Sequence, residues 1–247
     1  MMRSLILAGL AVGILGTSSA GDELRMGGSR QSVLVELFTS EGCSSCPPAD
    51  ALLERLHRTQ PVAGAQIIVL SEHVDYWNHI GWADPYSSPA FSTRQQQYAR
   101  RFRIEGPYTP QIVVDGRTEL LGSDARAAES AVRSSLQQPR TTVRIDADGH
   151  MATVEVDPLP AKTAHKANVY LAYAADSGTQ DVLRGENRGR RLHHVSIVKE
   201  LKQIGTIDDR SAFKTQVPVE NGMRLIVFVQ EAAQGPVWGS ALYLAGR

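Results

Sequence analysis

Short apolar runs alternate with helical patterns along the first half of the chain. Three runs are typical of buried strands: VLVELFT, AQIIVLSEHV and TPQIVVDGR. TELLG then follows the Asp115-Gly116 turn as a short antiparallel return. Helical spacing of apolar residues predicts helices over PPADALLERLHR, SSPAFSTRQQQYARRF and SDARAAESAVRSSLQ, the last with Ser123 or Asp124 as N-cap. The predicted order β-α-β-α-β-β-α indicates an α/β domain over residues 31–139, with its first strands parallel.

The pattern changes from about residue 140 onward. Alternating runs flank Asp148-Gly149 in TVRIDADGHMATVEV, which predicts a β-hairpin. Further short strands are predicted in ANVYLAYA, HHVSIVKEL, FKTQVPV, RLIVFVQE and PVWGSALYLA. Several short strands without a helical pattern favour an antiparallel β-sandwich domain over residues 140–247.

The N-terminus has the pattern of a secretory signal peptide. Arg3 precedes an apolar run from Leu5 to Leu15, and Ser18-Ser19-Ala20 forms a small-residue cleavage site. The run is roughly a dozen residues, against about 20 for a bilayer span. We therefore expect residues 1–20 to be removed, leaving an exported protein, periplasmic or secreted, with no integral membrane segment. An uncleaved anchor is the alternative.

Charge excludes some classes of partner. The chain of 247 residues has 26 basic and 26 acidic residues, a formal net charge of zero. Nucleic-acid-binding proteins show a basic excess or stripe, so we expect no nucleic-acid partner. Arg94, Arg100, Arg101 and Arg103 cluster on or after one predicted helix, and we interpret them as a solvated face.

Cys43 and Cys46 are the only two cysteines, and they directly follow the first predicted strand. A helix start lowers a thiol pKa through its free N–H groups and dipole. We therefore predict that Cys43, exposed ahead of the helix, attacks a protein or small-molecule disulfide. Cys46, nearer the helix and more buried, then resolves the mixed disulfide. Glu41, an anion close by, limits the expected lowering of the pKa. No cofactor is required for this chemistry.

A structural disulfide in a non-catalytic interaction module is an alternative. Closing a loop of four residues gains only about 2 kcal/mol, against roughly 3 kcal/mol for fifteen residues. A chain this long can bury a sizeable core without such a staple. The redox interpretation therefore leads.

The motifs together resemble known families. A strand, Cys-x-x-Cys at a helix start and Thr109-Pro110 before a β-hairpin resemble the thioredoxin fold. That resemblance implies a cis Pro110 facing the cysteines, with the backbone there able to pair with a substrate strand; a trans proline starting an edge strand is the alternative. VELFTSEGCSSCPPAD, HVDYWNHIGWADPYSS, YTPQIVVDG and GENRGRRL resemble an uncharacterised secreted family, domain of unknown function 1223. Neither resemblance supplies a substrate.

The segment after the second strand carries further candidates. His73 and Asp75 are interpreted as a proton relay during thiol exchange, and Trp77 as a substrate contact. The alternative is a long ordered loop in which the tryptophans fill a gap between domains. A different hypothesis is a copper or zinc site formed by the cysteines with His73 and His79. The GENRGRRL loop is expected to be ordered and packed against the first domain, without assigned chemistry.

Overall fold

The computed structural model describes residues 30–161, 163 and 166–245, so the predicted signal peptide lies outside the described residues. The first half contains the predicted elements in the predicted order. Its elements are β1 Gln31–Thr39, α1 Pro47–Thr59, β2 Ala65–His73, α2 Pro89–Phe102, β3 Gln111–Val114, β4 Thr118–Leu121 and α3 Ala125–Ser135. No helix within the described ranges is long and apolar enough to cross a membrane.

Local sequence determines where these helices begin. Prolines occupy the first two positions of α1, where a missing N–H costs nothing because it has no partner inside the helix. The Ser88 hydroxyl accepts a hydrogen bond from the N–H of Ala90 and caps α2. The Asp124 carboxylate does the same for the N–H of Ala127, so Asp124 is the N-cap of α3.

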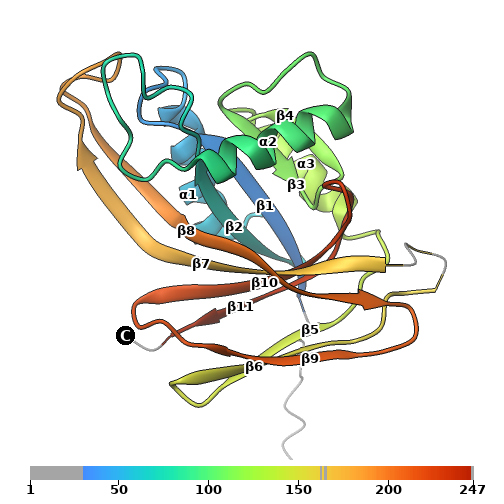
Figure 1. The fold of residues 1–247 in the computed structure, drawn as a ribbon. Helices are drawn as coiled ribbons and strands as arrows, with labels where there is room; N and C mark the ends of the chain where they lie inside the picture. Colours follow the sequence, from blue (N-terminus) through green and yellow to red (C-terminus); the bar gives the residue numbers. More distant parts are fainter. Residues whose placement is uncertain (1–29, 162, 164–165, 246–247) are drawn as a thin grey trace, which may run out of the picture.

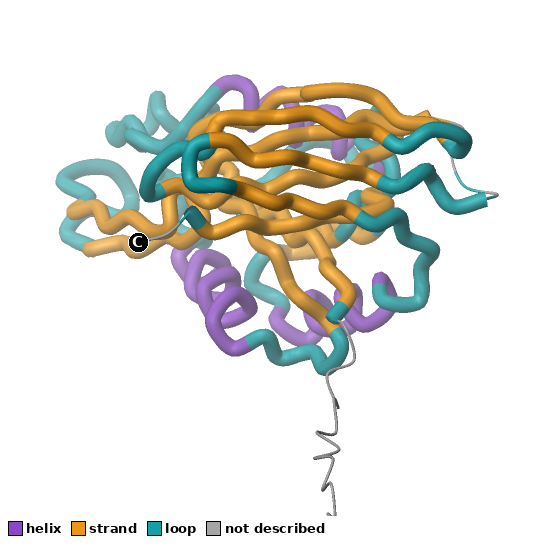
Figure 2. Tube along the Cα trace, turned by 90° about the horizontal axis from the view of Figure 1, so that it is seen from below, coloured by secondary structure: helices purple, strands orange, loops and turns teal. Residues whose placement is uncertain are grey.

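The second half consists of strands in the described residues. They are β5 Val143–Ala147, β6 Met151–Val156, β7 Lys166–Asp181, β8 Arg191–Asp208, β9 Phe213–Pro218, β10 Met223–Glu231 and β11 Val237–Leu244. Two sheets result: an eight-stranded mixed sheet of order β11-β10-β7-β8-β2-β1-β3-β4, and a three-stranded antiparallel sheet of order β5-β6-β9. In Figure 2, helices lie both above and below the band of strands.

The large sheet crosses the predicted domain boundary. β8 of the second half pairs in parallel with β2 of the first, at Ser71 and Ile197. Ser196 of β8 adds a hydrogen bond to this junction, because its hydroxyl donates to the carbonyl oxygen of Val69 on β2 at 2.6 Å. The three-stranded sheet packs on the β7–β10 side of the large sheet through a core that includes Val154 and Leu171. The expected β-sandwich therefore shares its larger sheet with the α/β half.

β7 and β8 are much longer than the short strands predicted, at 16 and 18 residues. Polar residues in their outer parts conceal the alternation on which the prediction depended. The two strands pair along nearly their whole length, from Lys166 opposite Asp208 to Asp181 opposite Arg191. Because β7 and β8 are long, the loop that connects them lies at the same end of the molecule as the loops after β1 and β2 (Figure 1).

Strand alternation divides the side chains of β1 between the two faces of the sheet. Val33, Val35 and Leu37 pack with α1 and α3. Leu34 packs with Phe91 of α2 and the antiparallel strands, and Phe38 packs with Tyr98 of α2. Both faces of the central parallel strands are thus buried, as expected when helices cover a parallel pair.

Arg94 does not belong to a solvated face. It is buried on the α2 side of the sheet, where its Nε donates to Glu36 at 2.6 Å and its guanidinium lies over the Tyr98 ring. Burial, together with the neighbouring Glu36 carboxylate, raises the pKa of Glu72 well above its usual range. The other arginines of the predicted cluster are exposed.

Candidate functional site

The two cysteines form a disulfide between the end of β1 and the start of α1. Their Cα atoms are 5.5 Å apart, within the usual range for a disulfide. The N–H of Cys43 donates to the carbonyl oxygen of Ser40, and the N–H of Cys46 donates to the carbonyl oxygen of Cys43, both at 3.2 Å. Cys46 is the N-cap residue of α1. The pair therefore lies beyond the carboxyl end of a parallel strand and at a helix N-terminus.

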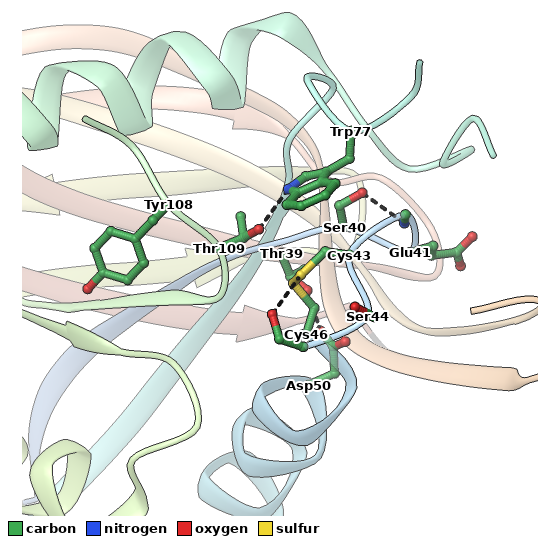
Figure 3. Close-up of a disulfide and its surroundings, with 12 residues drawn as sticks. Thr39, Ser40, Glu41, Cys43, Ser44, Cys46, Asp50, Trp77, Tyr108 and Thr109 are labelled. Carbon is green, nitrogen blue, oxygen red and sulfur yellow. Dashed lines mark hydrogen bonds between the residues drawn. A yellow bond between two sulfur atoms is a disulfide. The ribbon is translucent and has the colours of Figure 1, made fainter. Parts of the chain in front are cut away.

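Both cysteines are buried, with 0% exposure, so the prediction of an exposed Cys43 is wrong. The indole of Trp77, from the loop between β2 and α2, lies over the disulfide (Figure 3). Of residues 40–46, only Ser44 and Ser45 are exposed, and the Ser45 hydroxyl lies 3.4 Å from the Cys43 sulfur. Sequence spacing could not reveal this cover, because it comes from distant parts of the chain.

Thr109 lies beside the disulfide (Figure 3), and its peptide bond to Pro110 is cis, as the resemblance implied. The indole N–H of Trp77 donates to the Thr109 hydroxyl at 2.7 Å. Gly122 lies close to both the proline and helix α1. A Cβ there would come within 2.8 Å of Pro110 and 3.1 Å of Ala49. Any residue larger than glycine at position 122 would therefore push Pro110 and helix α1 away from β4.

The loop between β7 and β8 covers the cysteine loop from a second side. We call residues 182–190 the cap loop. The wholly buried amide of Asn187 donates to the carbonyl oxygens of Glu41 at 2.8 Å and Cys43 at 2.9 Å. Glu186 accepts from the N–H of Ser44 at 3.2 Å. Gly185, with φ of 74°, lies against Trp82, where a Cβ would come within 3.1 Å of the tryptophan Cβ.

His194 of β8 lies buried between two carboxylates of the cysteine loop and α1. Its Nε2 is 3.3 Å from Glu41 and its Nδ1 is 3.5 Å from Asp50. Asp50 also accepts from the Thr39 hydroxyl at 2.9 Å. Burial alone would lower the pKa of His194, but the Asp50 and Glu41 carboxylates outweigh it and raise the pKa to about 10. The imidazole is therefore a buried cation at neutral pH.

His73 stands next to this group, with its ring centroid 4.6 Å from that of His194. Its Nδ1 is 2.7 Å from the buried carboxylate of Asp84, and its Nε2 is 3.2 Å from the Ser71 hydroxyl. Burial would raise the pKa of Asp84, but hydrogen bonds and the charge of His73 lower it overall. Asp84 also accepts from the N–H of Glu41 at 2.8 Å, which ties this pair to the cysteine loop.

A family model described as "Protein of unknown function (DUF1223)" matches residues 34–230. The chain belongs to the DUF1223 family. It is similar to the crystal structure of protein AGR_C_4864 from Agrobacterium tumefaciens, with 26% identity and a TM-score of 0.71 over 88% of this chain and 96% of that one. It shares a fold with HBP35 of Porphyromonas gingivalis, at 11% identity and a TM-score of 0.57 over 87% and 75% of the two chains. No curated protein matches it.

The structure does not bring together the predicted relay of His73 and Asp75. His73 pairs with Asp84, whereas Asp75 accepts from the hydroxyl of Ser92 on α2. Glu41 lies in the cysteine loop, but its carboxylate bonds to the Trp82 indole N–H at 2.8 Å. The DUF1223 protein thus uses these groups in a different arrangement from the one the sequence indicated.

The described residues contain no group of three or more His, Cys, Asp and Glu side chains arranged to hold a metal ion. Both ring nitrogens of His73 already have polar partners, and His79 is exposed. The cysteine sulfurs are bonded to each other. The geometry therefore gives no support to the copper or zinc hypothesis in this arrangement.

The GENRGRRL loop packs against the first domain as expected, through Asn187, but sequence reasoning assigned Asn187 no contact with the cysteine loop and missed Asp50, Asp84 and His194. Asp50 follows Cys46 by four residues and thus lies one turn along the same helix, a signal that spacing could have supplied. Asn187 and His194 approach from more than 140 residues away in the chain. No local pattern identifies such partners.

Proposed function

We propose that this DUF1223 protein carries out thiol–disulfide exchange through Cys43 and Cys46. The observation that carries the proposal is the formed disulfide at the N-terminus of α1, next to Thr109, which a cis peptide bond joins to Pro110. The order β-α-β-α-β-β-α around it supports a thioredoxin-like half, and residues 1–20 support export to the periplasm or beyond. Export favours this chemistry, because disulfides persist outside the cytosol.

The exchange proceeds in two displacement steps. In the reduced protein the Cys43 thiolate attacks one sulfur of a substrate disulfide, forming a mixed disulfide and releasing the other substrate sulfur as a thiolate. Cys46 loses its proton to solvent or a nearby base, and its thiolate attacks the Cys43 sulfur. The second substrate thiolate leaves, and the Cys43–Cys46 disulfide forms. Two electrons pass from the protein to the substrate, and the reverse sequence oxidises a dithiol.

The surroundings support specific roles for three further groups. The dipole of α1 favours a thiolate at its start. It acts without free N–H groups, because Pro47 and Pro48 have none and those of Ala49 and Asp50 donate to the carbonyl oxygen of Cys46. The backbone of Thr109 would offer the polar groups for a substrate strand, because Pro110 has no N–H and its carbonyl oxygen accepts from the N–H of Gly122 at 2.9 Å. Trp77 and the cap loop must move aside before a substrate sulfur can reach Cys43, because both cysteines have 0% exposure.

Trapping experiments test the assignment of roles. With a disulfide substrate, Cys46→Ser should accumulate a mixed disulfide at Cys43, whereas Cys43→Ser should form none and should remain folded by circular dichroism. Exchange retained in Cys43→Ser would overturn the assignment of the nucleophile. The double variant with both cysteines changed to alanine is the control for reaction elsewhere.

One observation favours a second candidate function, an interaction module whose disulfide is structural: the complete burial of both sulfurs. The equilibrium reduction potential separates the two. Working thiol–disulfide proteins lie between about −120 and −270 mV, whereas structural disulfides lie below about −300 mV. A titration of the mature protein against glutathione buffers measures where the Cys43–Cys46 pair falls.

A further inference from the structure

The cap loop presents unpaired arginines next to the redox centre. Arg184, Arg188 and Arg190 are all exposed. Within the described part of the chain, none of these three has a carboxylate at ion-pair distance, whereas the adjacent Arg191 faces Asp181 at 3.9 Å. Because the whole chain has no net charge, this is a local concentration of positive charge.

The backbone of the cap loop holds these side chains outward. Asn187 points inward, where its amide bonds to the cysteine loop. Tight turns on either side, with the N–H of Arg188 donating to Gly185 at 3.2 Å and the N–H of Arg190 donating to Asn187 at 3.0 Å, reverse the chain around it. The acidic residue of the loop, Glu186, is engaged by the Ser44 N–H. The three arginines therefore lie within three residues of Asn187, whose side chain bonds to the carbonyl oxygen of Cys43.

Exposed apolar side chains gather at the same place. Five large hydrophobic residues are exposed among the described residues, and three of them adjoin the redox centre. Leu183, 70% exposed, belongs to the cap loop. Ile80 is 37% exposed, and its carbonyl oxygen would lie 3.2 Å from a Cβ at Gly185 of that loop. Leu121, 53% exposed, precedes Gly122, whose N–H donates to the carbonyl oxygen of Pro110. Single exposed apolar residues are ordinary, but their concentration around one site indicates contact with a partner.

We propose that this rim, formed by Ile80, Leu121, Leu183 and the three arginines, docks the substrate as a cysteine-bearing polypeptide segment with acidic and apolar residues beside its cysteine. The inference rests on the proposed exchange function and names its substrate class. Arginine and exposed apolar side chains together fit a polypeptide, since both are favoured at protein interfaces. A small anionic thiol would use the charges but leave the apolar side chains without contact.

The test measures how fast the oxidised protein oxidises dithiol peptides of equal length. The first peptide thiolate attacks Cys43, Cys46 leaves as a thiolate, and the second peptide thiolate then releases Cys43, so two electrons pass to the protein. Glutamate and leucine flank the cysteines in one peptide, lysine and leucine in a second, and serine in a third. At low ionic strength the acidic peptide should react about 10-fold faster than the basic one, and added salt should reduce the difference.

Two charge-reversal variants provide the matched comparison. R184E/R188E/R190E should abolish or reverse the preference for the acidic peptide. R100E/R101E/R103E makes the same change in net charge on and after α2, and it should leave the preference as in the wild type. Circular dichroism checks both folds. Loss of the preference in both variants alike, or in neither, would overturn the proposed docking surface.

Further substrates separate this inference from the exchange function. If dithiothreitol and all three peptides react at equal rates, exchange stands and the docking proposal fails. If neither dithiothreitol nor any peptide is oxidised, the exchange function itself fails. If glutathione is oxidised as fast as the acidic peptide, the protein recognises charge alone and the assignment of a polypeptide substrate is wrong.

Discussion

The side-chain amide of Asn187 donates a 2.9 Å hydrogen bond to the carbonyl oxygen of Cys43, across 144 residues of chain. The same amide donates to the carbonyl oxygen of Glu41, so one buried residue from the β7–β8 loop fixes the backbone of the cysteine loop at two points. The antiparallel half of the molecule therefore forms part of the wall of the candidate redox site. It does more than extend the sheet.

Removing this amide should loosen the cysteine loop. We expect Asn187→Ala to lower the free energy of unfolding by about 1–3 kcal/mol, because two buried carbonyl oxygens lose a donor. Reduction of the Cys43–Cys46 disulfide by dithiothreitol should also become faster. Urea unfolding and a stopped-flow reduction assay measure the two effects. Asn168→Ala, which removes an amide from β7 with only a 3.4 Å contact to Tyr170, is the control. Equal effects of the two variants would contradict a specific role for Asn187.

Trp77 should control access to the sulfurs through its ring. Trp77→Ala removes the indole that covers the disulfide, so we expect severalfold faster reduction by dithiothreitol. Trp77→Phe keeps an aromatic cover and loses only the donor to Thr109, so its rate should stay near that of the wild type. An equal acceleration in both variants would show that the hydrogen bond, rather than the ring, holds the site closed.

The sequence was sufficient to predict elements with strong local signals. Apolar runs, the paired prolines of α1 and the Asp124 cap are local features, and the structure confirms each of them. The burial of Cys43 could not be predicted in this way, because Trp77 and the cap loop that cover it come from other parts of the chain. Nor could the continuous sheet, since the β2–β8 junction depends on one pairing between distant strands. Long-range contacts determine most of the candidate site.

Asp84 should stabilise the fold above acidic pH. Its pKa lies below its ordinary value of 3.8, because hydrogen bonds and the charge of His73 outweigh the effect of burial. A lowered folded-state pKa contributes stability above the unfolded pKa, and that stability is lost as the pH falls through the folded value. We expect Asp84→Asn to move acid unfolding, followed by tryptophan fluorescence, to higher pH. Asp146→Asn, which removes an exposed carboxylate from β5, is the comparison. Equal shifts for the two variants would contradict a special contribution from the buried pair.

His194 should give the protein a stability that declines at alkaline pH. Its folded-state pKa of about 10 exceeds its ordinary value of 6.5, because the Asp50 and Glu41 carboxylates outweigh burial. A raised pKa contributes stability that is complete below the unfolded pKa and is lost as the pH rises through the folded one. The free energy of unfolding in urea should therefore decrease between pH 6.5 and about 10. His194→Gln should remove most of this decrease, whereas His193→Gln, at an exposed neighbouring position, should retain it. An unchanged pH dependence in His194→Gln would show that the imidazole is not a buried cation in the folded protein.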